Sequence, residues 1–179
     1  LATFLENIHA AGLDPAIVDV GPNAIVNATL PMELETSGGI ALLNIGAKQS
    51  DLSILQDGNL IAIRSLPVGS SSLKLHSSQG LAPLVQRLRQ TIQKVLVQHN
   101  LTIRKILVSG DIATSRTLDA LLSGVLEIEV APFSPFSADI PKGVADDDKT
   151  NAVYAKSLGL AFRLTHLIRE RQINLRKGE

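Results

Sequence analysis

Hydrophobic and polar residues follow each other in patterns that predict both strands and helices. Residues 40–45 are almost wholly apolar, as in a strand that is buried on both faces. Two further strands, 52–56 and 60–66, flank a tight turn at Asp57-Gly58, where glycine accepts a positive φ without steric cost. The pattern therefore predicts a three-stranded antiparallel meander.

The chain after the meander is expected to alternate between helices and strands. Residues 81–100 carry apolar side chains at i, i+3 and i+4 spacing, which predicts an amphipathic helix of about five turns. A strand at 105–109, a helix from a Thr/Ser cap to Gly124, a strand at 126–130 and a long helix at 150–171 follow. This order predicts an α/β domain with a mixed sheet, unlike a Rossmann sheet, in which crossovers dominate from the start.

The first forty residues are expected to form a separate segment. Residues 1–8 have helical spacing, 14–20 read as a short buried strand, and 21–30 suggest a turn and a second helix. Residues 31–39 are polar and end in glycine, as in a connection between subdomains. The chain opens on Leu1 inside a helical pattern, so we expect a piece of a longer protein.

Composition removes several classes of function. The 17 basic and 17 acidic residues cancel, and aromatic residues make up only 3% of the chain, so nucleic-acid binding is not expected. The chain has no cysteine, which excludes disulfides, thiolate zinc sites and a thiol nucleophile. No apolar run approaches the roughly 20 residues that span a bilayer.

Candidate metal and catalytic groups are weak. The histidines are far apart and lack metal-ligand spacing: His9, His76, His99 and His166. The acids at 146–148 read as the solvated start of a helix, and the serines at 70–72 have no partner acid or glycine elbow. We therefore predict no metal and no catalytic residue.

The segment "LLNIGAKQSDLSILQDGNLIAIRSLPVG" (42–69) resembles the start of the second actin-like subdomain in the PilM group of pilus-assembly proteins. In that pattern Asn44 takes the place of an aspartate, and Gly46, Arg64 and Gly69 occupy their usual places. The segments "AGLDPAIVDVGPNAIVNA", "KILVSGDIA" and "NAVYAKSLGLAFR" are similar to further pieces of the family, in the same order. The resemblance implies an actin-like, ribonuclease H-like α/β subdomain with a mixed sheet.

The final residues, "QINLRKGE", resemble a segment of the GspL proteins of type II secretion. In those proteins the segment follows the cytoplasmic domain and leads toward the membrane. Ile173, Asn174 and Leu175 also match the "INL" peptide with which PilN docks on PilM. The resemblance implies the end of a first subdomain and a connector at 1–36, a second subdomain at 37–171 and a juxtamembrane tail at 172–179. It also implies a first subdomain upstream and a transmembrane helix downstream.

Basic residues near the end of the chain are typical of a segment that flanks a membrane span. Each basic residue near anionic headgroups adds about 1 kcal/mol to the free energy of membrane binding. They outnumber the single acid Glu170 and comprise Arg163, Arg169, Arg171, Arg176 and Lys177. The alternative is an ordinary basic helix C-terminus favoured by the helix dipole.

The nucleotide motifs of the family are degenerate here. A working actin-like site implies an aspartate that organises a magnesium–water shell, whereas Asn44 is neutral. The turns after Gly46 and at Gly110 each contain one glycine, and Asp111 adds a negative charge beside the second. We therefore expect no nucleotide cofactor, and interpret both glycines as architectural.

The resemblance implies a non-catalytic scaffold on the cytoplasmic face of the bacterial inner membrane, tied to the membrane by a span outside this fragment. Its expected partners are a secretion or pilus assembly ATPase, inner-membrane platform proteins and a second copy of the chain. The expected partner-binding residues are Ile173, Asn174, Leu175, Arg64, Asp57 and Gly58. The alternatives are a PilM-like protein whose ATP state gates partner binding, and a degenerate FtsA relative from cell division.

Overall fold

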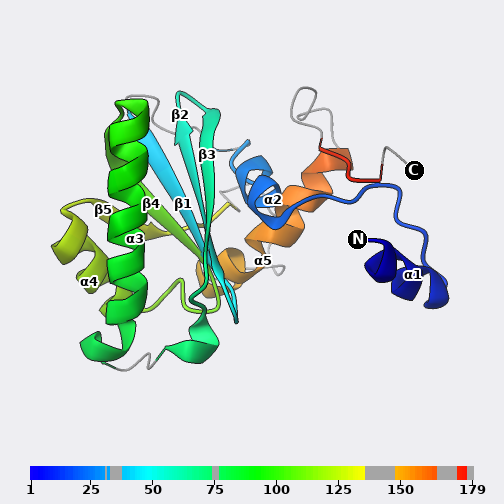
Figure 1. Cartoon of the computed structure of the whole chain (residues 1–179), viewed down its shortest axis with the longest axis horizontal. Coiled ribbons are helices and arrows are strands. Elements are labelled where there is room, and N and C mark those ends of the chain that lie inside the picture. Colours follow the sequence, from blue (N-terminus) through cyan, green and yellow to red (C-terminus); the bar gives the residue numbers. More distant parts are fainter. Residues whose placement is uncertain (31, 33–37, 74–76, 136–147, 165–172, 177–179) are drawn as a thin grey trace.

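A five-stranded mixed sheet with helices on both faces forms the centre of the molecule (Figure 1). The computed structural model describes residues 1–30, 32, 38–73, 77–135, 148–164 and 173–176. The strands are β1 (Gly39–Ile45), β2 (Ser50–Gln56), β3 (Asn59–Leu66), β4 (Ile103–Gly110) and β5 (Glu129–Pro132). Their spatial order is β3-β2-β1-β4-β5.

Strand directions follow from the connections. The pairs β1–β2 and β2–β3 are antiparallel, as short hairpins require. The pairs β1–β4 and β4–β5 are parallel, and helices make the crossovers. The predicted α/β class and the predicted mixed sheet, a meander followed by alternating helices and strands, are therefore confirmed.

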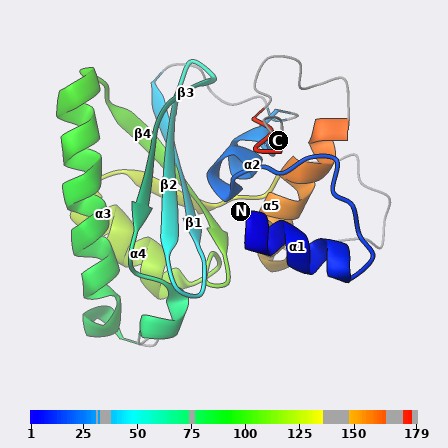
Figure 2. The same ribbon diagram turned by 45° about the vertical axis from the view of Figure 1, so that its right-hand side comes forward.

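Two pairs of helices cover the two faces of the sheet (Figures 1 and 2). α3 (Ser78–His99) and α4 (Arg116–Leu126) cover one face, and α2 (Gly21–Asn27) and α5 (Asp148–Ala161) cover the other. α1 (Ala2–Ala10) lies away from the sheet, and short 3-10 turns form η1 (Ser70–Ser72) and η2 (Phe162–Leu164).

Strand β1 is buried on both sides, which explains its unbroken apolar sequence. Ala41, Leu43 and Ile45 join the larger core beneath α3 and α4. Ile40 and Leu42 join the smaller core beneath α2 and α5. Because side chains alternate between faces along a strand, one sequence run supplies both cores.

The contact between α2 and α5 depends on one glycine. A Cβ built on Gly159 of α5 would lie 1.7 Å from the carbonyl oxygen of Ala24 in α2. The two backbones therefore approach each other more closely than any side chain at this position would permit. α2 thus shares a core with the sheet; the division of the chain at residue 36 stays a prediction.

The strand expected at 126–130 lies later, at Glu129–Pro132, because α4 extends to Leu126, and three further predicted elements differ from the structure. Residues 14–20 form no strand, because Val18 pairs with Asn174 and Leu175 from the other end of the chain and not with the sheet. The helix predicted to end at Gly124 continues to Leu126, where Glu127 takes the left-handed capping conformation with φ 55°.

The third difference concerns the last helix, expected over 150–171. α5 runs only from Asp148 to Ala161, and the 3-10 turn η2 follows it. This tightening of the backbone accompanies the turn of Arg163 into the protein. Residues 165–172 lie outside the described part of the chain.

Candidate functional site

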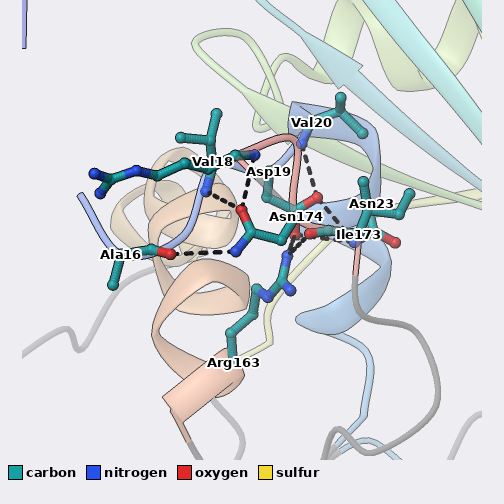
Figure 3. A network of polar contacts seen from close by, with 9 residues as sticks. Ala16, Val18, Asp19, Val20, Asn23, Arg163, Ile173 and Asn174 are labelled. Carbon is teal, nitrogen blue, oxygen red and sulfur yellow. Dashed lines mark hydrogen bonds and ion pairs between the residues drawn. The ribbon is translucent and has the colours of Figure 1, made fainter. Parts of the chain in front are cut away.

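The end of the chain is docked on its own N-terminal part. The segment 173–176, which we call the tail, lies along residues 14–20, which we call the connector (Figure 3). The Leu175 N–H donates to the Val18 carbonyl at 2.9 Å, and the Val18 N–H donates to Oδ1 of Asn174 at 3.1 Å. Nδ2 of Asn174 donates to the Ala16 carbonyl at 3.2 Å. The Asn174 amide thus serves as donor and acceptor to the connector backbone, as a neighbouring strand would.

A buried ion pair lies beneath this contact. The guanidinium of Arg163 is 2.5 Å from Oδ2 of Asp19, and their side chains are only 3% and 0% exposed. Arg163 also donates to the Ile173 carbonyl of the tail. One arginine therefore connects η2, the connector and the tail (Figure 3).

The Asp19 carboxylate has further donors around it. Nδ2 of Asn23 lies 3.0 and 2.9 Å from its two oxygens, and the Val20 N–H lies 2.7 Å from Oδ1. A buried charge is tolerated only when it is paired and its remaining lone pairs are hydrogen-bonded. These contacts meet that condition for Asp19, and they join α2 to the network.

Arg176 makes the outer contact of the tail. It donates to the Pro15 carbonyl and lies 2.7 Å from the Asp14 carboxylate, which also accepts from His9 at 3.1 Å. The hydrogen bond from Arg176, then its charge, and the smaller contribution of His9 hold the pKa of Asp14 below its ordinary value. Asp14 is exposed, so this pair adds less to stability than the buried pair does.

The apolar side chains of the tail contribute little to its docking. Ile173 and Leu175 remain 40% and 45% exposed. The tail is therefore held by its backbone, Asn174 and Arg176. The apolar groove expected for Ile173 and Leu175 stays a prediction for a neighbouring molecule.

Two basic residues of the expected membrane flank have other roles. Arg163 is buried against Asp19, and Arg176 is paired with Asp14. Neither guanidinium is therefore free for a lipid headgroup in this arrangement. Arg169, Arg171 and Lys177 lie outside the described residues.

The first glycine turn is filled by the protein's own backbone. The Gly46 N–H donates to the Gln49 carbonyl at 3.0 Å, and the Gly46 carbonyl accepts from the Ser70 N–H at 2.9 Å. A Cβ on Gly69 would lie 2.4 Å from the Ala47 carbonyl oxygen. The Gly46 N–H, a donor of the kind that could face a phosphate, is thus used within the turn, and the Gly46 carbonyl holds the segment around η1.

The second glycine turn also has a structural reason. Gly110 has φ +96°, and a Cβ there would lie 2.1 Å from the Ile45 carbonyl oxygen. Asp111 accepts from the Ser70 hydroxyl at 3.2 Å, which places a carboxylate between the two turns. A triphosphate would meet this negative charge.

Asn44 is buried, and its Oδ1 accepts from the Ser109 hydroxyl at 3.1 Å. A neutral amide in this position lacks the charged oxygen that a magnesium–water shell favours. The residues at both turns therefore do not fit a magnesium nucleotide, although the fold family implies one.

The other expected partner-binding residues lie on the β2–β3 hairpin. Asp57 and Gly58 have φ of 51° and 72°, as a two-residue hairpin turn requires. Arg64 of edge strand β3 donates to the Ile63 carbonyl at 2.8 Å and contacts Gln98 of α3 at 3.5 Å. The structure places these residues and the tail on different elements, so they form two separate surfaces.

Sequence reasoning identified the tail and its Asn174, but not the buried residues beneath the tail that hold it in place. Asp19 and Asn23 lie in a largely apolar stretch, and Arg163 follows the apolar end of α5. A lone charge inside an apolar stretch is a signal for a buried pair. It could have suggested Asp19 and Arg163, although not that they pair with each other.

A helix must be both long and apolar to cross a bilayer. In the part of the chain that the structure describes, no helix combines the length and the apolar character that a bilayer crossing needs.

Comparison with known proteins reveals similarity at the level of structure. No protein-family model and no curated protein matches the sequence. A solved structure of a PilM-PilN type IV pilus biogenesis complex is similar with a TM-score of 0.76 and 22% identity, covering 90% of this chain and 56% of that one.

Two further solved structures are more distant. The ethanolamine utilization protein EutJ from Carboxydothermus hydrogenoformans has a TM-score of 0.59 at 16% identity, over 86% of this chain and 57% of that one. A Bacteroides thetaiotaomicron protein with an actin-like ATPase fold has a TM-score of 0.50 at 10% identity, over 78% and 43% of the two chains.

The chain spans a little more than half the length of the first two of these proteins. The strand order, the two helical layers and these similarities together lead to one conclusion. The chain has the actin-like ATPase fold in the form seen in PilM.

Proposed function

We propose that this chain is a non-catalytic docking scaffold of an inner-membrane secretion or pilus-assembly platform, most similar in role to the cytoplasmic domain of GspL. The proposal places it on the cytoplasmic face of the bacterial inner membrane. It would link the assembly ATPase to membrane subunits, either as a single copy or as a homodimer.

The observation that carries the proposal is the docked tail. The solved complex of similar fold contains both PilM and PilN. In this chain a segment that contains Ile173, Asn174 and Leu175 lies on the same polypeptide, held by Asn174 and Arg163. A domain that binds its own outgoing segment would transmit a pull or rotation from a membrane partner into α2 and the sheet.

A second candidate function is nucleotide-gated partner binding, which the actin-like fold favours. The neutral Asn44 and the filled glycine turns argue against it. Calorimetric titration of the full chain with ATP, with and without magnesium, separates the two. We expect no saturable heat; binding in the micromolar range that requires magnesium would favour the gated protein over the scaffold.

The scaffold itself is tested by direct binding. The full chain is immobilised and titrated with the purified assembly ATPase and with the soluble parts of the platform subunits from the same cell. Saturable binding of at least one is expected, and failure of all of them would overturn the scaffold.

Charge reversal at Arg64 tests the hairpin as the ATPase surface. Arg64→Glu should weaken ATPase binding, whereas Lys48→Glu, an equal charge change in the β1–β2 turn, should not. Unchanged binding by a folded Arg64→Glu variant would exclude the hairpin surface and leave the scaffold in place.

A further inference from the structure

Charge is strongly segregated along this neutral chain. Residues 58–110 contain no aspartate or glutamate, but they contain seven basic residues: Arg64, Lys74, Arg87, Arg89, Lys94, Arg104 and Lys105. Because the chain has 17 basic and 17 acidic residues, the remainder holds ten basic residues against all 17 acids. The net charge of zero therefore conceals a positive region and a negative region.

Helix α3 carries the middle of the positive region on its outer surface. Its apolar face is buried against the sheet by Leu84, Leu88 and Ile92. Its outer surface exposes Arg87, Arg89 and Lys94, none of which makes an ion pair with any residue that the structure describes. Figures 1 and 2 show α3 at the outside of the molecule, on the opposite side of the sheet from α2 and α5.

The middle of this outer surface is made of glutamines and one valine. Gln86, Gln90 and Gln93 are exposed there. Val97 is 85% exposed beside them. Side chains three and four apart on a helix are neighbours, so these four residues form one continuous stripe, with Arg89 on one side and Arg87 and Lys94 on the other. Elsewhere on the helix, the exposed residues are Gln79, Ala82, Pro83, Gln98 and His99.

Two hollows flank the N-terminal half of α3. A hollow of about 200 Å³ between α3 and α4 is lined by Ala82, Val85, Gln86, Arg89, Leu121 and Val125. A hollow of about 510 Å³ on the other side is lined by Val68, Pro83, Gln86, Arg87 and Gln90. Arg89 thus borders one hollow, Arg87 borders the other, and Gln86 lies between them.

We propose that the outer surface of α3, with the hollow beside α4, is a docking site for an acidic amphipathic segment of a partner protein. Its carboxylates pair with Arg87 and Arg89, and its apolar side chains enter the hollow lined by Ala82, Leu121 and Val125. The glutamines hydrogen-bond the polar groups of the same segment. We call this surface the α3 site.

The chemistry of the site favours a protein segment as its occupant. The hollow beside α4 is smaller than the roughly 300 Å³ at which small-molecule sites begin, and its apolar lining suits single side chains. Planar guanidinium groups match carboxylates in a two-point geometry, which fixes orientation as well as charge. Arginine is also one of the residue types that contribute most binding energy at protein–protein contacts.

A membrane or a nucleic acid fits the α3 site less well. The apolar face of α3 is buried in the core, so a bilayer would meet only three basic residues spread among glutamines. Each of them would add about 1 kcal/mol to the free energy of membrane binding. The exposed residues of α3 that the structure describes include no Phe, Tyr or Trp on which bases could stack. Both partners are nevertheless outcomes of the test below.

The inference goes beyond the proposed function, because it rests on α3 and α4 and involves neither the tail nor the β2–β3 hairpin. A failure of the scaffold proposal would leave it unchanged. Its own failure would equally leave the docked tail intact.

The test uses the full chain and a displayed library of random peptides about four helical turns long. We expect the selected peptides to be rich in aspartate and glutamate, with leucine-like residues at i, i+3 and i+4 spacing. Their affinity should fall as salt rises, because exposed charge pairs are screened.

Charge variants then locate the binding. The double variant Arg87→Glu/Arg89→Glu should weaken the selected peptides at least about tenfold. Arg87→Lys/Arg89→Lys keeps the charge and should retain part of the affinity, whereas Lys48→Glu should have no effect. Ala82→Phe, which fills the hollow without a charge change, should also weaken binding. Thermal unfolding verifies that each variant is folded.

Three results would overturn the proposal. The first is a selection without enrichment of acidic residues. The second is peptide binding that the double charge reversal leaves unchanged. The third is binding to vesicles of phosphatidylserine and phosphatidylcholine, or to duplex DNA, that the same reversal abolishes while no peptide is selected; this would assign the surface to a membrane or a nucleic acid.

Discussion

At the scale of single residues, the buried pair of Arg163 and Asp19 carries more than its own two charges. It orients the Ile173 carbonyl of the tail and the Asn23 amide of α2 at the same time. A buried pair adds little stability compared with apolar residues of the same shape, but losing one partner leaves the other charged and unpaired. The pair is therefore a specificity device for the docking of the tail.

The first prediction follows from this asymmetry. Arg163→Met should lower the free energy of unfolding by about 3–5 kcal/mol, because Asp19 then stays buried without its counter-charge. Urea denaturation measures the loss. The double variant Asp19→Asn/Arg163→Met should recover part of it, since no buried charge remains; an equal or greater loss in the double variant would contradict this account.

Asn27 of α2 supports a second prediction. It is completely buried, and neither its nitrogen nor its oxygen has a hydrogen-bond partner among the residues that the structure describes. An unsatisfied buried amide costs about 1–3 kcal/mol, so Asn27→Leu should raise the free energy of unfolding by about that amount. Urea denaturation should show a higher midpoint.

Asn23, one turn earlier in the same helix, is the matched control. Its amide donates to both oxygens of Asp19, so Asn23→Leu should lower the free energy of unfolding. If both leucine variants shift the midpoint in the same direction, hydrogen bonding does not explain the difference between the two asparagines.

At the scale of elements, the packing of α2 on α5 is set by backbone contact. Gly159→Ala would place a methyl group 1.7 Å from the Ala24 carbonyl oxygen, which requires the helices to separate. We expect a loss of about 3 kcal/mol from overpacking in chemical denaturation. Because α2 touches the Arg163–Asp19 network, the tail should loosen as well.

Gly124 gives the control, since it also lies within a helix but has open space where a Cβ would be. Gly124→Ala should raise the free energy of unfolding by about 0.5–1 kcal/mol, through a smaller loss of backbone entropy. A destabilised Gly124→Ala variant would show that an added methyl group is costly even without a close contact, and the loss at Gly159 could then not be assigned to the Ala24 carbonyl.

The tail is the second element whose behaviour can be predicted. Asn174→Ala removes the side chain that bonds Val18 and Ala16, so the Leu175 amide should exchange with solvent about tenfold faster. Hydrogen exchange measures this at one residue. Asn59→Ala, a change of the same kind in the exposed β2–β3 hairpin, should leave Leu175 protection unchanged.

The pH dependence of tail docking follows from Asp14. Arg176 lowers the pKa of Asp14 below the ordinary value of 3.8, so the pair stabilises docking above that value. Its contribution is lost only as the pH falls through the lowered pKa. Protection of the Leu175 amide should therefore be constant from neutral to mildly acidic solution and should fall in strong acid; a loss near neutral pH would assign the pH dependence to another group.

At the scale of the whole molecule, the tail and the α3 site lie on opposite faces of the sheet. The face covered by α2 and α5 leads to the connector and the tail. The face covered by α3 and α4 presents the basic α3 site. Because neither surface overlaps the other, the scaffold that we propose would have room for two partners at once.

The two glycine turns have a structural reason that does not involve a nucleotide. The turns at Gly46 and Gly110 are filled by the backbone around Gly69 and by Asp111. Their glycines are required by close contacts within the domain itself.

The sequence by itself determined the elements and their order. Unbroken apolar strands, the Asp57-Gly58 turn and the apolar stripe of α3 are local patterns, and each produces the same element in any context that buries it. The short helix α5 and the absent strand at 14–20 could not be predicted this way, because contacts from the other end of the chain decide them.

Only the tertiary structure decided which distant residues meet. Asp19 and Arg163 lie 144 positions apart, and no local pattern specifies a pair across that separation. The same holds for Asn174 and Val18 at 156 positions. A buried charge needs a counter-charge, and a backbone N–H or carbonyl needs a hydrogen-bond partner, but any suitable residue that the fold brings close can serve. The candidate site therefore becomes visible only in three dimensions.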